Sequence, residues 1–77
     1  MNIDIKDIIT LSDDNEYIVT SKAVYDNKIY YFLVDINDNS NMKFLYEEND
    51  KLKEVNNYKI IEAIIPLLLE ETKKELT

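Results

Sequence analysis

The sequence contains no glycine, and this absence constrains every tight turn in the fold. Tight turns between strands often need a positive φ, which glycine adopts freely and which asparagine and aspartate tolerate better than other residues. Short clusters of Asn and Asp separate the apolar runs along the chain. We therefore expect Asn and Asp to form the turns between short apolar elements.

The apolar runs have the alternation and the β-branched and aromatic content that are typical of strands. Asp26 and Asn27 lie between two of these runs and are predicted to form a type I′ hairpin turn. The predicted strands are residues 5–11, 17–25, 28–36 and 42–46, with a shorter fifth strand at 52–55. The predicted turns and loops between them are 12–15, 37–41 and 47–50.

Two of these strands predict how the faces of the sheet are used. Residues 28–36 are apolar on both faces, which indicates a central strand. A helix would cover one face, and a partner or the curl of the sheet itself would cover the other. Along the preceding strand, the alternation places Tyr17, Val19, Ala23 and Tyr25 on one face.

The C-terminal segment predicts a helix over residues 58–75, with Asn56 or Asn57 as its N-cap. Pro66 interrupts the helical pattern, and a single kinked helix is favoured over two short helices. The residues expected on the core face are Ile61, Ile64, Ile65, Leu68 and Leu69. Ile60 and Leu67 are then surplus apolar residues, available either to the core or to a partner.

These elements predict a single α+β domain over residues 1–77. Short connections favour an antiparallel β-meander of four to five strands, with the C-terminal helix, kinked near Pro66, packed on one face. The segment 63–69 is the longest apolar run and is too short to span a membrane. The N-terminal residues lack the pattern of a signal peptide, so we expect a cytoplasmic protein.

The composition removes most catalytic chemistry. The chain has no His, Cys or Arg, which excludes the common near-neutral acid and base, thiolate chemistry and bidentate phosphate binding. We therefore expect no enzyme, no cofactor and no metal. Sixteen acidic residues against nine lysines give a net charge of −7. This charge disfavours direct contact with nucleic acid or anionic membranes and favours a basic protein partner.

One polar segment approaches a calcium-binding pattern. Asp35, Asn37 and Asn39 occupy the first, third and fifth positions of an EF-hand-like loop. Ser40 stands at the position of the usual glycine, and Tyr46 stands at that of the bidentate glutamate. The segment is therefore interpreted as a polar hairpin loop. The acidic pairs at 13–14, 47–48 and 70–71 are interpreted as solvated surface.

The aromatic residues fall almost entirely on the predicted strands. Seven of them are placed there: Tyr17, Tyr25, Tyr30, Tyr31, Phe32, Phe44 and Tyr46. Core and cross-strand packing is the favoured interpretation, and an aromatic protein contact on an uncovered sheet face is the alternative. Base stacking with a single-stranded nucleic acid is disfavoured by the acidic charge.

The pattern resembles the YrzB-like family of small acidic bacterial proteins, a domain of unknown function. The resemblance is carried by residues 7–11 before an acidic turn, by 16–19, by 25–34, and by the aromatic strand 44–48 with the C-terminal helix. Asn15 and Pro66 depart from the family's usual pattern. The resemblance implies the fold and a bacterial or phage origin, and it implies no activity and no site residue.

The leading functional hypothesis is a small acidic protein-binding module without enzymatic activity. Its sharper form is an inhibitor or regulator of a basic nucleic-acid-binding protein, of the phage anti-defence type, whose acids mimic phosphates. The alternative is a self-associating structural protein, such as a homodimer that uses the C-terminal helix or an edge strand. The candidate partner-binding residues are Asp13, Asp14, Asp35, Asp38, Glu47, Glu48, Asp50, Ile60 and Leu67.

Overall fold

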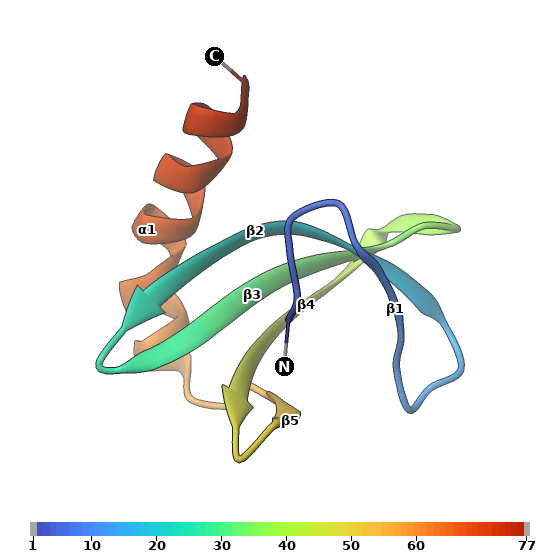
Figure 1. The fold of residues 1–77 in the computed structure, drawn as a ribbon, viewed down its shortest axis with the longest axis horizontal. Helices are drawn as coiled ribbons and strands as arrows, with labels where there is room; N and C mark the ends of the chain where they lie inside the picture. Colours follow the sequence, from blue (N-terminus) through green and yellow to red (C-terminus); the bar gives the residue numbers. More distant parts are fainter. Residues whose placement is uncertain (1, 77) are drawn as a thin grey trace.

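A computed structural model describes the backbone of residues 2–76 and the side chains of residues 2–70. Five strands form one antiparallel sheet in the order β1-β2-β3-β4-β5, and one helix follows. The elements are β1 (Ile8–Thr10), β2 (Glu16–Tyr25), β3 (Lys28–Asp35), β4 (Asp38–Glu48), β5 (Lys51–Glu54) and α1 (Tyr58–Leu76). The sheet curls into half of a barrel, with α1 beside the end of β2 (Figure 1). The predicted α+β meander is confirmed.

Asn and Asp form the tight turns, as the absence of glycine predicts. Asp26 and Asn27 have φ of 50° and 64°, which is the type I′ arrangement expected between β2 and β3. Asn49 and Asp50 repeat this arrangement between β4 and β5, with φ of 53° and 62°. Asp14 has φ of 65° in the turn after β1. Each of these residues takes a conformation that is uncommon for a side chain with a Cβ.

The predicted polar loop at 37–41 is wrong, because β4 already begins at Asp38. The connection is only Ile36 and Asn37, and the Asp35 carboxylate accepts the Asn37 N–H at 2.8 Å. Residues 38–40 are exposed and polar. They therefore lack the alternation of apolar and polar residues from which a strand is predicted. The predicted turn at 47–50 is likewise shorter, because β4 continues to Glu48.

A β-bulge in β2 changes which side chains share a face. Val19 pairs with Leu33 and Ser21 pairs with Phe32, so Thr20 is an additional residue without a counterpart on β3. Tyr17 and Val19 therefore lie on the inner face of the curl, whereas Ala23 packs in the cluster beneath the helix. The prediction that all four alternating residues share one face is wrong because the bulge reverses the alternation.

The core has two layers, one on each face of the sheet. The layer inside the curl is centred on Tyr17, Val19, Tyr31, Leu33 and Leu45. The layer beneath α1 is centred on Tyr30, Val55, Ile64 and Leu68. The sheet's own curl therefore covers the second face of β3. The segment before β1 also packs into the curl through Ile3, and its Lys6 N–H donates to the Val19 carbonyl at 2.7 Å.

The helix begins as predicted and is continuous through Pro66. The Asn57 side chain accepts the Lys59 N–H at 2.9 Å, which confirms Asn57 as the N-cap. The alternative of two short helices is wrong, and a kink at Pro66 stays a prediction. Among residues 58–70 of α1, whose side chains the structure describes, only Ile64 and Leu68 are buried against the curved sheet.

The prediction that Ile65 and Leu69 face the core is wrong, because they are 38% and 56% exposed. Ile60, which was left open between the core and a partner, is half-buried and packs against the layer beneath the helix, which is the first of these alternatives. Leu67 is half-buried. The surplus apolar surface of the helix is therefore formed by Ile65 and Leu69.

Candidate functional site

The meander sorts the candidate acids into two groups at opposite ends of the sheet. Antiparallel pairing places the turn after β1 and the connection after β3 at one end, with Asp13, Asp14, Asp35 and Asp38. The turns after β2 and β4 lie at the other end, next to residues 47–50. The structure therefore brings together the first four acids and separates them from the other three.

A hydrogen-bond network connects the two acidic turns at the first end. The Tyr17 hydroxyl donates to Asp13 Oδ2 at 2.6 Å, and this bond lowers the pKa of the Asp13 carboxyl. The Asn41 amide donates to the Tyr17 hydroxyl at 2.9 Å and to Asp35 Oδ2 at 3.1 Å. The Ser40 hydroxyl donates to Asp38 at 2.6 Å and lowers the pKa of that carboxyl. The carboxylates of Asp13, Asp35 and Asp38 therefore each hold local structure through hydrogen bonds.

The acids at the second end are partly neutralised. Glu48 forms ion pairs with Lys53 at 3.0 Å and with Lys28 at 3.4 Å. The hydrogen bond and charge of Lys53, followed by those of Lys28, lower the pKa of the Glu48 carboxyl. Glu47 accepts a hydrogen bond from the Tyr31 hydroxyl at 3.0 Å. A basic partner at this end would compete with contacts that the chain already makes.

The Tyr31 phenol is expected to keep its proton far into the alkaline range. Burial, followed by the hydrogen bond to Glu47, raises the pKa of Tyr31 to about 12. The unfolded chain releases this proton near pH 10, so the stabilisation is complete below pH 10 and is lost as pH rises toward 12. The difference in phenolate absorbance between the wild type and Tyr31→Phe measures this titration. A difference that develops near pH 10 would contradict it.

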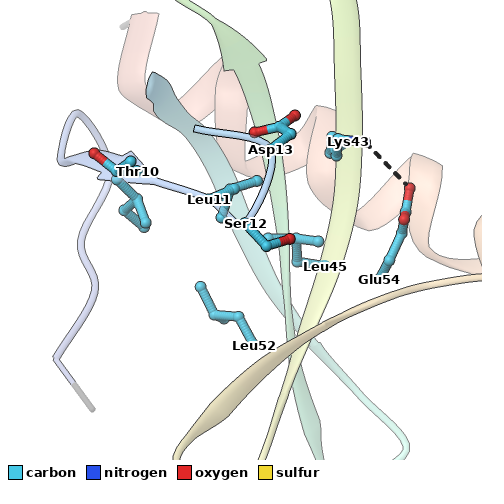
Figure 2. Close-up of a pocket in the computed structure, with 9 residues that line it drawn as sticks. Thr10, Leu11, Ser12, Asp13, Lys43, Leu45, Leu52 and Glu54 are labelled. Carbon is cyan, nitrogen blue, oxygen red and sulfur yellow. Dashed lines mark ion pairs between the residues drawn. The ribbon is translucent and has the colours of Figure 1, made fainter. Parts of the chain in front are cut away.

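A cavity of about 340 Å³ lies between the two edges of the sheet. We call this cavity the seam. Its residues are Ile9, Thr10, Leu11, Ser12, Asp13, Lys43, Leu45, Leu52 and Glu54. Figure 2 shows Leu11, Leu45 and Leu52 among the residues that line it, and Lys43 paired with Glu54, at 3.6 Å. β1 and β5 form its walls and are not paired with each other. The half-barrel is therefore open along this line.

A second cavity of about 280 Å³, the apolar groove, lies between α1 and the sheet. Its residues are Thr20, Ser21, Phe32, Met42, Phe44, Ile65, Leu68 and Leu69. Phe32 and Phe44 stack with a ring separation of 5.2 Å. Met42 is 53% exposed, and together with Ile65 and Leu69 it presents apolar surface to solvent. The groove contains no charged side chain among the described residues.

The Ser21 hydroxyl is the unusual group of the apolar groove. Ser21 is fully buried, and its Oγ has no hydrogen-bond partner within the part of the chain that the structure describes. Leaving such a group unpaired costs about 1–3 kcal/mol. Ser21 follows the bulge at Thr20, which brings it onto the helix side of the sheet.

The described residues contain no cluster of three or more acidic side chains arranged to hold a metal ion. Asp35 is the last residue of β3, Asn37 lies in the connection, and Asn39 lies on β4, so these three residues do not form a continuous loop. Within residues 2–76, no helix has the length and apolar content needed to cross a membrane.

The residues that form the apolar groove were not predicted from the sequence. Ile60 and Leu67 were expected to be the surplus apolar residues, whereas the exposed apolar side chains at the groove are Met42, Ile65 and Leu69. The helical spacing offered one signal, because Ile61, Ile64 and Leu68 suffice for a single buried stripe. No comparable signal marks Ser21 or the seam, since both depend on the bulge and on the curl.

No protein-family model, curated protein or solved structure matches the chain. The resemblance to the YrzB-like family therefore stays a prediction, and no site residue is transferred from another protein.

Proposed function

We propose that the chain is a protein-binding module without enzymatic activity, and that it binds a basic partner through the apolar groove. The observation that carries this proposal is the exposure of Met42, Ile65 and Leu69 around a groove that lacks charged residues. Contiguous apolar surface of this kind is typical of the centre of a protein interface. Apolar side chains from a partner would bury it.

The negative charge of the chain indicates what kind of partner surface it would bind. The chain carries a net charge of −7, and Glu62 is exposed three and seven residues before Ile65 and Leu69. This spacing places Glu62 on the same face of α1 as the two apolar residues. The preferred partner surface therefore has apolar side chains surrounded by Lys or Arg. Charge complementarity accelerates such binding and makes it sensitive to salt.

The unpaired Ser21 hydroxyl supports the same proposal. Its Oγ is satisfied by no described residue, and it lies at the groove rather than at a remote point of the core. A polar atom of a partner inserted into the groove would supply the missing hydrogen bond after a small displacement of the neighbouring side chains. Binding would then remove a cost that is present in the free protein.

Inhibition of a basic nucleic-acid-binding protein is the specific form of this function that we propose. Asp14 and Glu16 are exposed beside the network of Asp13 and Asp35 and add negative charge at that end. Because Asp13 and Asp35 already hold the turns, the acids act through long-range attraction and the apolar groove supplies the contact. Such a complex should compete with nucleic acid and weaken as the salt concentration rises.

A charge placed in the apolar groove should abolish partner binding. The Ile65→Glu variant is expected to reduce retention of the partner from a lysate of the source organism by at least about tenfold, because a carboxylate would be desolvated in the interface. Val24→Glu is the matched control, since Val24 is 69% exposed and lies outside the groove. Equal retention by the two variants, measured by affinity capture and mass spectrometry, would contradict the proposed site.

Self-association is the second candidate function, and the exposure of Ile65 and Leu69 on α1 favours it. In that case a second copy would bury the apolar groove. Sedimentation at micromolar concentration separates the candidates. A particle of 9.1 kDa eliminates self-association, and a dimer that Ile65→Glu dissociates would replace the basic partner with a second copy.

A further inference from the structure

We propose that the seam binds an extended segment of a partner protein as a sixth strand, which runs antiparallel to both β1 and β5. This inference concerns a surface distinct from the apolar groove and does not depend on it. Three features of the seam support it. The first is the direction of the free backbone groups on the two strands that border it. The others are the parallel direction of these two strands and the side chains between them.

The first wall is the outer edge of β1. The Leu11 N–H donates to the Asn15 carbonyl and the Val19 N–H donates to the Asp7 carbonyl, while Ile9 lies opposite Tyr17. Hydrogen-bonded pairs recur at every second residue of an antiparallel ladder, so the backbone groups of Ile9 also point toward β2. The N–H and C=O groups of Ile8 and Thr10 therefore point away from β2 and are available to another strand.

The second wall is the outer edge of β5. The Val55 N–H donates to the Phe44 carbonyl, which sets the alternation of the β4–β5 ladder. Lys53 lies opposite Tyr46 and Lys51 lies opposite Glu48, so these two residues share hydrogen bonds with β4. The N–H and C=O groups of Leu52 and Glu54 then point outward, and the side chains of both line the seam.

The odd number of strands in the sheet explains why the half-barrel remains open. All neighbouring strands are antiparallel, so β1 and β5, the first and the fifth, run in the same direction. Direct pairing of these edges would create one parallel ladder in an otherwise antiparallel barrel. One additional strand that is antiparallel to both would instead complete a barrel of six alternating strands. The fold therefore favours a single inserted strand.

The side chains of the seam define the segment that would fit. Leu45 is buried, and Leu11 and Leu52 are half-buried, so every second residue of the inserted strand should be apolar and point into the curl. Asp13 and Glu54 border the seam, and Lys43 already pairs with Glu54. These two acids lie at the end of the seam next to the turn after β1, so a Lys or Arg belongs at the end of the segment that lies there. The intervening residues face the other side of the sheet, beside Lys51 and Lys53, and should be polar and uncharged. Because β1 has three residues and β5 has four, the pairing is short.

Amide hydrogen exchange tests this proposal with a defined peptide. The probe is a seven-residue peptide with valine at every second position, threonine between, and lysine at its N-terminal end, which would lie next to Asp13 and Glu54. Added to the ¹⁵N-labelled protein, it should slow exchange at Ile8, Thr10, Leu52 and Glu54 by about tenfold or more, because their N–H groups become hydrogen-bonded. The same peptide with N-methylated backbone amides is the control and should give no protection, since its methyl groups prevent the close approach of two strands and it offers no N–H to the carbonyls of the edges.

A protein variant provides the matching control. Thr10→Pro removes an outward N–H while leaving the bonds of β1 to β2, and proline is tolerated at sheet edges. It should abolish the protection, whereas Thr10→Ala should retain it. Absence of protection at millimolar peptide, or protection only around Met42 and Leu69, would overturn the proposal. Protection of the four edge amides on raising the concentration of the protein alone would assign the seam to a second copy instead.

Discussion

Replacing Leu33 with alanine should lower the free energy of unfolding by about 2–5 kcal/mol. Leu33 is fully buried inside the curl, where it packs in the cluster with Tyr17 and Tyr31. A 77-residue domain has a total stability of only about 4–12 kcal/mol, so the variant should lose a large fraction of it. Urea unfolding monitored by circular dichroism measures the change.

The matched control for this prediction is Leu69→Ala. The chemical change is the same, but Leu69 is 56% exposed at the apolar groove, so the variant should lose only about 0.5 kcal/mol. Equal losses from the two variants would show that the curl does not contain the main core. Because Leu69→Ala is expected to fold, it also serves to measure the contribution of the apolar groove to partner binding.

Replacing Asp35 with alanine should cost about 1–3 kcal/mol, although aspartate is usually a surface residue. Asp35 is only 6% exposed and accepts hydrogen bonds from the Asn37 N–H and the Asn41 amide. Its removal leaves both donors unpaired and disturbs the bond from Asn41 to the Tyr17 hydroxyl. Thermal and urea unfolding should both show the loss.

Asp38→Ala is the control that separates structural from electrostatic effects. It removes the same charge at the same end of the sheet, but Asp38 is exposed, and its carboxylate accepts hydrogen bonds from the N–H and the hydroxyl of the neighbouring Ser40. Its effect should stay within about 1 kcal/mol. If the two variants lost equal stability, the network around Asn41 would not support the acidic end.

Local chemistry predicts most of the fold from the sequence. The turn at Asp26 and Asn27 follows from the tolerance of these residues for positive φ, and the N-cap at Asn57 follows from its side-chain acceptor. The start of β4 could not be predicted, because residues 38–40 lack apolar alternation and the strand begins where Asp38 pairs with Asp35 of β3. The bulge at Thr20 has no sequence signal, and it reverses the faces of β2.

The candidate site was less predictable than the fold, because it depends on curvature. Helical spacing predicted that Ile64 and Leu68 would face the core, but the curved sheet leaves Ile65 and Leu69 exposed. The acidic turns were identified as exposed charge, whereas Asp35 is buried by a network that joins residues distant in sequence. Such tertiary contacts cannot be predicted from periodicity.

Amide hydrogen exchange of the free protein and of its complex with the captured partner tests whether the apolar groove is the binding surface. Exchange should slow at the residues of the groove, above all around Met42, Ile65 and Leu69, and binding should weaken at higher salt. Protection confined to the acidic turns at 12–15 and 36–38, with the groove unchanged, would contradict binding through the apolar groove.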